Sequence, residues 1–194
     1  DVFLGGASGV GGQLFLQQKD GHFVASTEAQ PWVADKAYAD WGALFFDANG
    51  DGKPDLYVAS GGYQLGPSSR LLQDRLYINR GDGRFVRDTA ALPVMLTSTA
   101  TVRAGDFNGD GRPDLYVASM QGHDEVWYNL GGGRFQNRGR QVFPATPWGA
   151  MGLKVLDWNG DGQFDLIVER RDAAGQPERL RLLRRQQQRP PRRR

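Results

Sequence analysis

A ten-residue acidic loop that recurs three times constrains the fold of this chain more than any other feature of its sequence. The copies share the pattern D-x-N-G-D-G-x-x-D-L, occupy residues 47–56, 106–115 and 157–166, and begin 59 and 51 residues apart. Turn-forming residues alone do not keep the same positions fixed in three copies. A long motif repeated at such intervals predicts a repeat architecture, in which each repeat forms one supersecondary unit.

The segments around each loop repeat as well, and they have the character of β-strands. A short apolar stretch precedes the loop, a strand-like run follows it, and a second β-rich run leads to a glycine turn that ends in Phe. In the first complete repeat these segments are residues 42–46, 56–60, 75–79 and 81–85. The Asp-Gly pair in that turn is a strong hairpin signal, and a last short strand leads to the next loop. Four strands per repeat of this length are typical of the blades of a β-propeller.

The repeats therefore predict an all-β chain, a β-propeller built of four-stranded antiparallel blades. We expect the blades to fill residues 1–184, as a partial blade over 1–30, blades over 40–90 and 100–143, and a partial blade over 150–184. Asp1 aligns with the last acidic residue of a loop, so the chain is expected to open inside a blade. Because both partial blades carry the second and third strands, they duplicate rather than complete one another. We therefore expect about four blades, forming an arc of a larger ring of roughly six to eight blades.

Within each loop, the spacing of oxygen-bearing residues suits a hard cation. Positions 1, 3, 5 and 9 carry carboxylate or amide oxygens, and glycines at positions 4 and 6 let the backbone wrap so that these oxygens face one point. Position 7, which is Lys53, Arg112 or Gln163, can add its backbone carbonyl. The chain has no cysteine, which leaves oxygen as the donor, and oxygen ligands in this number favour Ca²⁺ over Mg²⁺.

An EF-hand loop begins in a similar way, but the sequence excludes it. That loop requires a bidentate Glu at position 12, where this chain has Val58, Val117 and Val168, and it requires flanking helices where this chain has strand-like runs. The other alternative is that the three stretches are only Asp- and Asn-rich turns. Turns alone do not explain the Asp at position 9 of every copy.

The loop pattern, together with its downstream glycine-Phe hairpin, resembles the FG-GAP/VCBS repeats of integrin α-like propellers. Residues 56–62 and 74–79 also resemble bacterial VCBS-repeat and ASPIC/UnbV-type proteins, and the resemblance extends over residues 1 to about 184. It implies three complete calcium sites and a truncated fourth site at Asp1. The side-chain ligands that it implies are Asp47, Asn49, Asp51 and Asp55, then Asp106, Asn108, Asp110 and Asp114, then Asp157, Asn159, Asp161 and Asp165.

A candidate partner-binding surface lies on the face opposite the calcium loops. The number of residues between the last Asp of a loop and the next hairpin Phe varies, because one blade carries an insertion near 60–70. Variable loops on a rigid scaffold are common sites of binding. The residues predicted to meet a protein or glycan there, on the connections between strands 2 and 3 and between blades, are Tyr63, Arg70, Trp32, Trp41 and Trp148. The alternative for each aromatic residue is packing between blades.

The sequence shows no catalytic signature, so we expect a binding module rather than an enzyme. No nucleophile elbow, dinucleotide fingerprint or phosphate loop occurs. The predicted function is a calcium-binding propeller module for extracellular protein or glycan binding or adhesion, located outside the cell, at its surface or in a periplasm. The alternatives are the propeller portion of a carbohydrate-active lyase or dehydratase, and a structural spacer in a multidomain surface protein.

The net charge of +2 conceals an uneven distribution. Residues 178–194 carry +7, so the rest of the chain carries −5, and the basic character belongs to the Arg-, Gln- and Pro-rich tail over 185–194, which we expect to be disordered. Without interleaved aromatic residues or a fold around it, this tail predicts no specific nucleic-acid partner. No run approaches eighteen apolar residues, so we expect no membrane span.

Overall fold

The computed structural model describes residues 1–120, 122–139, 150–157, 165–171 and 177–183. In these ranges the chain forms β-strands and two short 3-10 helices, η1 Pro31–Val33 and η2 Arg70–Leu72. The strands are β1 Val2–Leu4, β2 Gln13–Gln17, β3 Phe23–Ala25, β4 Asp40–Phe46, β5 Asp55–Ser60, β6 Arg75–Asn79, β7 Phe85–Asp88, β8 Thr99–Gly105, β9 Asp114–Ser119, β10 Glu125–Asn129, β11 Phe135–Asn137, β12 Ala150–Leu156, β13 Asp165–Arg171 and β14 Pro177–Leu183. Within the described ranges, no helix is long and apolar enough to cross a bilayer.

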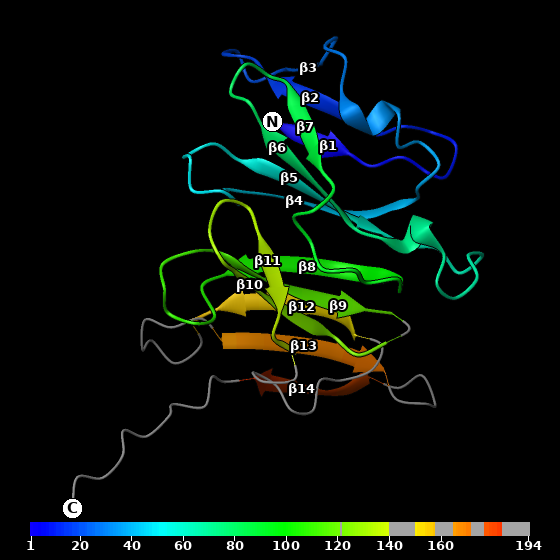
Figure 1. Ribbon diagram of the computed structural model, residues 1–194, viewed down its shortest axis with the longest axis vertical. Helices are drawn as coiled ribbons and strands as arrows, with labels where there is room; N and C mark the ends of the chain where they lie inside the picture. Colours follow the sequence, from blue (N-terminus) through cyan, green and yellow to red (C-terminus); the bar gives the residue numbers. More distant parts are fainter. Residues whose placement is uncertain (121, 140–149, 158–164, 172–176, 184–194) are drawn as a thin grey trace, which may run out of the picture.

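The strands form four antiparallel sheets that follow one another along the chain (Figure 1). We name them blade 1 (β1–β3), blade 2 (β4–β7), blade 3 (β8–β11) and blade 4 (β12–β14). Neighbours in sequence are neighbours in each sheet, with no crossover. The first strands of successive blades lie beside each other, β4 next to β8 and β8 next to β12. The prediction of an all-β chain with four-stranded propeller blades is confirmed.

Blade 2 is buried on both of its faces, and its central strand shows why. All six residues of β5 are buried. Because successive side chains of a strand point to opposite faces, Leu56 and Val58 pack toward blade 1, whereas Tyr57 and Ala59 pack toward blade 3. A strand with this environment reads in the sequence as an unbroken apolar run rather than as an alternating pattern.

In the part of the chain that the structure describes, two hydrophobic clusters between blades, which we call seams, are each centred on a buried tryptophan. Trp32 of η1 packs among Phe3, Leu14, Tyr77 and Phe85 between blades 1 and 2. The second seam places Trp127 of β10 with residues of β5, β6, β8 and β9 between blades 2 and 3. The blades are thus held face to face by apolar side chains. The loops at the ends of the sheets lie outside these contacts.

Candidate metal loops and the opposite face

The first two acidic loops connect β4 to β5 and β8 to β9, at the same end of their blades. Their glycines at positions 4 and 6 all have a left-handed backbone: φ is 81° at Gly50 and Gly52, 80° at Gly109 and 83° at Gly111. A side chain is strained in this region, so glycine is required at both positions. The sequence prediction that these glycines wrap the loop agrees with that geometry.

The carboxylate at position 1 lies inside the wrapped backbone. In the first loop, Asp47 accepts hydrogen bonds from the backbone N–H groups of Gly50 (2.7 Å), Asp51 (3.1 Å) and Gly52 (2.8 Å). Asn49 Oδ1 accepts a further bond from Asp51 N (2.9 Å). These bonds hold the loop in its wrapped conformation.

The second loop repeats this arrangement. Asp106 accepts from the N–H groups of Gly109 (2.6 Å), Asp110 (3.2 Å) and Gly111 (2.9 Å), and Asn108 Oδ1 accepts from Asp110 N (2.8 Å). Partial burial of Asp106 opposes ionisation, but the backbone donors outweigh it, and the pKa of Asp106 is lowered overall. The position-1 carboxylate is therefore held in its anionic form.

The carboxylate at position 9 has a structural role that the sequence did not reveal. Asp55 is buried, and it accepts hydrogen bonds from Ala48 N (2.9 Å) at the start of the loop and from Asn79 N (2.8 Å) at the end of β6. Asp114 does the same in blade 3, with Phe107 N (3.0 Å) and Asn129 N (2.8 Å). This residue ties the loop to the third strand of its own blade.

Asp1 makes the corresponding contact in blade 1. Its Oδ1 accepts from Gln17 N (2.9 Å) at the end of β2, as Asp55 does from Asn79 at the end of β6. The alignment of Asp1 with position 9 of a loop therefore agrees with its place in the structure.

Burial raises the pKa of both position-9 carboxyls. For Asp114 the pKa rises to about 6, and for Asp55 it also rises. Desolvation is the main cause in each case, and the neighbouring loop carboxylates add to it; for Asp114 these are Asp110 and Asp106. The ionised form of the position-9 carboxyl is thus disfavoured by burial and by the neighbouring carboxylates. A cation bound beside it would favour the ionised form.

Position 5 is paired with the basic residue at position 7. Lys53 Nζ lies 3.2 Å from Asp51 Oδ2, and Arg112 Nη2 lies 2.6 Å from Asp110 Oδ2. In this arrangement, and within the ranges that the structure describes, no three acidic or histidine side chains converge as a ligand set for an ion. The donor atoms of the loops suit Ca²⁺, but position 5 would have to turn from its basic neighbour to reach a shared ion.

The third loop can be followed only at its ends. Asp157 is exposed after β12, and Asp165 is buried at the start of β13, as position 9 is in the other loops. The predicted ligands Asn159, Asp161 and Gln163 lie outside the described residues.

The first loop also contacts the neighbouring blade. Asn129 of β10 donates through Nδ2 to Ala48 O at 2.9 Å, which joins blade 3 to the loop of blade 2. Blades 1 and 2 are joined in a similar place, where Gln30 donates to Gly83 O (2.7 Å) and accepts from Phe85 N (3.3 Å). Order in the loop is therefore coupled to order between blades.

The residues predicted for the opposite face have different environments. Trp32 is only 2% exposed and makes ring contacts with Phe3, Tyr77 and Phe85, so it is a packing residue between blades, not a surface residue. The sequence placed it in a connection between blades, but η1 turns the indole into the seam. Trp148 lies outside the described residues.

Trp41 and Tyr63 form an exposed aromatic pair at this face. They are 42% and 64% exposed, and their rings meet edge to face at 5.7 Å. Trp41 is the extra residue of a bulge in β4, because Asp40 pairs with Ser60 and Gly42 with Ala59. A bulge re-aims the side chain of the extra residue. Its indole lies on Gly61, where an added Cβ would come within 2.8 Å of the ring.

Sequence reasoning missed a second buried carboxylate in each complete blade. Asp74, just before β6, accepts from Ser60 N (2.6 Å), from Thr99 Oγ1 (2.6 Å) and from the Tyr57 hydroxyl. The signal was present in the sequence, because an Asp precedes the third strand of both complete blades at Asp74 and Asp124.

Asp124 has the same role in blade 3. It accepts from Ser119 N (2.9 Å) and from Tyr116 Oη (2.8 Å). In each complete blade, two carboxylates thus join the two central strands, one at each end. Each carboxylate lies at the start of one central strand and accepts a hydrogen bond from the last N–H of the other. Asp55 and Asp74 form such a pair in blade 2, and Asp114 and Asp124 form it in blade 3.

Comparison with known proteins agrees with this geometry. The FG-GAP-like repeat family matches residues 1–58, 66–117 and 106–168, so the matches cover most of the chain. The chain is also similar to integrin alpha-PS3 of Drosophila melanogaster, with 35% identity over 98 residues. That alignment covers 48% of this chain and 9% of the integrin subunit. With its repeated loops, antiparallel blades and matched repeats, this chain belongs to the FG-GAP-like repeat family of integrin-like β-propeller proteins.

Proposed function

We propose that the chain is a non-catalytic, calcium-binding propeller module that binds a protein or glycan partner outside the cell, at its surface or in a periplasm. The similarity to an integrin α-subunit supports an adhesion-type role. Extracellular calcium modules bind at about 10⁻⁴ to 10⁻³ M, and we expect an affinity in that range for these exposed loops. In this proposal calcium is structural, and the partner lies against the opposite face.

The observation that carries the calcium proposal is the acceptor capacity left in the loops. A carboxylate offers about four lone-pair sites. In the first loop Asp47 accepts three hydrogen bonds, whereas Asp51 and Asp55 accept two each. Each carboxylate therefore retains acceptor capacity after the loop has folded, and a cation can use it without loss of the backbone bonds.

Calcium is expected to raise the melting temperature of the full chain relative to excess chelator. A site filled at 100 times its dissociation constant contributes about 2.7 kcal/mol, which corresponds to roughly 5–10 °C for a domain of this size. Scanning calorimetry with calcium and with chelator measures the shift. Asp51→Asn should reduce the shift, because it removes one ligand charge from an exposed position.

Asp82→Asn is the matched control, because Asp82 is an exposed acid that pairs with Arg84 in the β6–β7 hairpin outside the loop. It should leave the calcium shift unchanged. Identical melting curves with calcium and with chelator would contradict the calcium part of the proposal.

Lys53→Gln is expected to tighten calcium binding at the first loop by about two- to fivefold. The ammonium of Lys53 lies 3.2 Å from Asp51 Oδ2 and repels a cation, and because exposed pairs of this kind are weak, the gain from its removal is a small factor. The third loop already carries glutamine at this position, as Gln163. Calorimetric titration with calcium measures the change. Lys36→Gln removes the same charge from an exposed site at the other end of the blade and should have no effect; an equal gain in both variants would refute the competition between Lys53 and calcium.

A further inference from the structure

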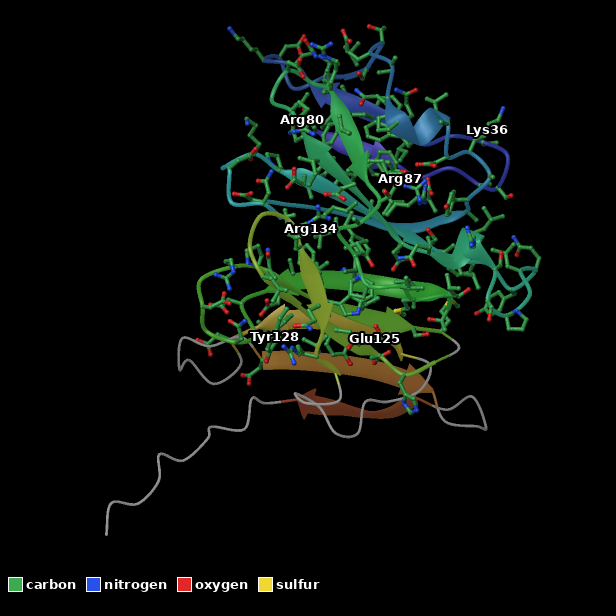
Figure 2. All side chains as sticks on the ribbon, viewed as in Figure 1. Lys36, Arg80, Arg87, Glu125, Tyr128 and Arg134 are labelled. Atoms are coloured by element: carbon green, nitrogen blue, oxygen red, sulfur yellow. The ribbon has the colours of Figure 1, made fainter. Side chains whose placement is uncertain are left out.

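A cavity of about 390 Å³ lies at the end of blade 2 opposite the acidic loops. Its walls come from the end of the β5–β6 connection, the end of β7 and the β7–β8 connection. The lining includes Arg70, Arg75 and Arg87. Figure 2 shows Arg87 in the right half of blade 2, whereas Arg80 of the β6–β7 hairpin lies to its left. The volume falls in the range of about 300–1,000 Å³ that is typical of ligand sites.

Two of these arginines are already neutralised within the blade. The buried Arg75 pairs with Asp40, and its guanidinium lies 4.3 Å from the ring centroid of Tyr38. Arg87 pairs with Asp35, and its guanidinium lies 5.2 Å from the centroid of the same Tyr38 ring. These contacts fix the cationic wall of the cavity in place.

The two aspartates that line the cavity already have hydrogen-bond or ion-pair partners, so neither of them neutralises Arg70. Asp88 lies 3.2 Å from Arg134 Nη1, and Asp74 accepts the hydrogen bonds described above. Arg70 is exposed, and in the part of the chain that the structure describes its guanidinium has no hydrogen bond or ion pair. The cavity therefore has one unpaired positive charge at its edge.

The other wall is apolar and is held in place by hydrogen bonds. Leu92, Val94 and Leu96 line it, and the Val94 side chain is 81% exposed. Gln73 holds this segment, because its side chain donates to Pro93 O (3.1 Å) and accepts from Met95 N (3.2 Å). The lining of this one cavity therefore includes both an arginine without an ion pair in the described ranges and a group of apolar side chains.

We propose that this cavity binds an acidic peptide segment of a protein partner, with a Glu or Asp carboxylate against Arg70 and an adjacent apolar side chain on Val94. This inference rests on the proposed function, and it commits to a protein rather than a glycan. A sugar presents hydroxyl groups that would lie unpaired against Leu92, Val94 and Leu96. A carboxylate next to an aliphatic side chain satisfies both walls, and Arg and Tyr are enriched at the energetic centres of protein interfaces.

The test uses the full chain in saturating calcium and a blocked pentapeptide, Ala-Leu-Glu-Leu-Ala. We expect saturable shifts in the NMR resonance of the Arg70 side-chain Nε–H group, and affinity about two- to fivefold weaker for the matched peptide with Gln in place of Glu. Arg70 is exposed, so its ion pair with a carboxylate is screened by water and changes the affinity only by a small factor. Arg70→Gln should abolish the preference for Glu, whereas Arg80→Gln, an exposed arginine at the other end of the blade, should preserve it.

Three results would overturn the inference. They are equal affinity for the Glu and Gln peptides, an unchanged preference in Arg70→Gln, and binding of a galacturonate trisaccharide with no binding of either peptide. The last result would leave a carboxylate site but would assign it to a glycan. None of them affects the calcium-dependent melting shift, so failure of this inference is distinguishable from failure of the proposed function.

Discussion

Trp32→Ala is expected to lower the free energy of unfolding by about 3–5 kcal/mol, the range for removal of a fully buried aromatic side chain. The indole makes ring contacts at 5.2 Å with Phe3, 5.6 Å with Tyr77 and 5.4 Å with Phe85. These partners belong to β1, β6 and β7, so the cavity would open in the seam between blades 1 and 2. Urea-induced unfolding, followed by tryptophan fluorescence and by circular dichroism, measures the loss.

Trp41→Ala is the matched control, because it removes the same side chain from an exposed position in β4. Its cost should stay near 1 kcal/mol, the contribution of the edge-to-face contact with Tyr63. If the two variants lose the same stability, Trp32 does not hold the seam. A loss confined to blade 1, seen as a second unfolding transition, would show that the seam joins two separately stable parts.

Asp74→Ala is expected to cost about 3 kcal/mol at pH 7. The substitution leaves three donors without their acceptor: Ser60 N, Thr99 Oγ1 and the Tyr57 hydroxyl. Each unsatisfied buried group costs about 1–3 kcal/mol, and removal of the desolvated carboxylate recovers part of the total. Chemical denaturation at constant calcium measures the difference from wild type.

The cost of Asp74→Ala should increase as the pH falls. Burial raises the pKa of Asp74 to about 6, well above the usual range of an aspartate. The folded state therefore binds the proton more readily than the unfolded state, and the stability from this group is largest below pH 4 and is lost as the pH rises through about 6. Wild type should gain about 1 kcal/mol from this group between pH 7 and pH 5, and Asp74→Ala should lack that gain.

A double-mutant cycle separates this carboxylate from its neighbours. Tyr57→Phe removes one of the three donors, so its cost should shrink in the Asp74→Ala background by about 1 kcal/mol or more. Additive costs would indicate that the bond between Tyr57 and Asp74 contributes nothing. The same pH slope in wild type and Asp74→Ala would contradict the assignment of the raised pKa to this group.

The spacing of the motifs predicted most of the architecture, because hairpins and tight glycine turns are local features. The position of Gly50 and Gly52 in the loop requires a left-handed backbone whatever the rest of the molecule does. The strands around the loop pair with their neighbours in sequence, so their order follows without long-range information. Four-stranded repeats of this length predicted the propeller, and the match to the FG-GAP-like repeat family supports that prediction.

Side-chain environments were harder to predict, because they depend on contacts between blades. Trp32 and Trp41 both lie in or beside a connection between blades, but η1 buries the first and the bulge in β4 exposes the second. The sequence pattern predicts a metal ligand at position 9, and the structure shows that this Asp also joins the loop to the third strand. The sequence shows that an Asp is present at this position, but it does not distinguish a metal ligand from an acceptor that joins two strands.

The acidic repeat by itself determined the blades, their strand order and the wrapped loops, since those depend on contacts within about 50 residues. Only the tertiary structure decided which carboxylates join strands, which basic side chains pair with the Asp at position 5, and where an arginine lies beside an apolar wall. Asp74 and Thr99, or Gln73 and Pro93, meet because blades pack face to face and bring separate connections together. Contacts of that kind arise from packing between repeats, and they differ from blade to blade even where the repeated motif does not.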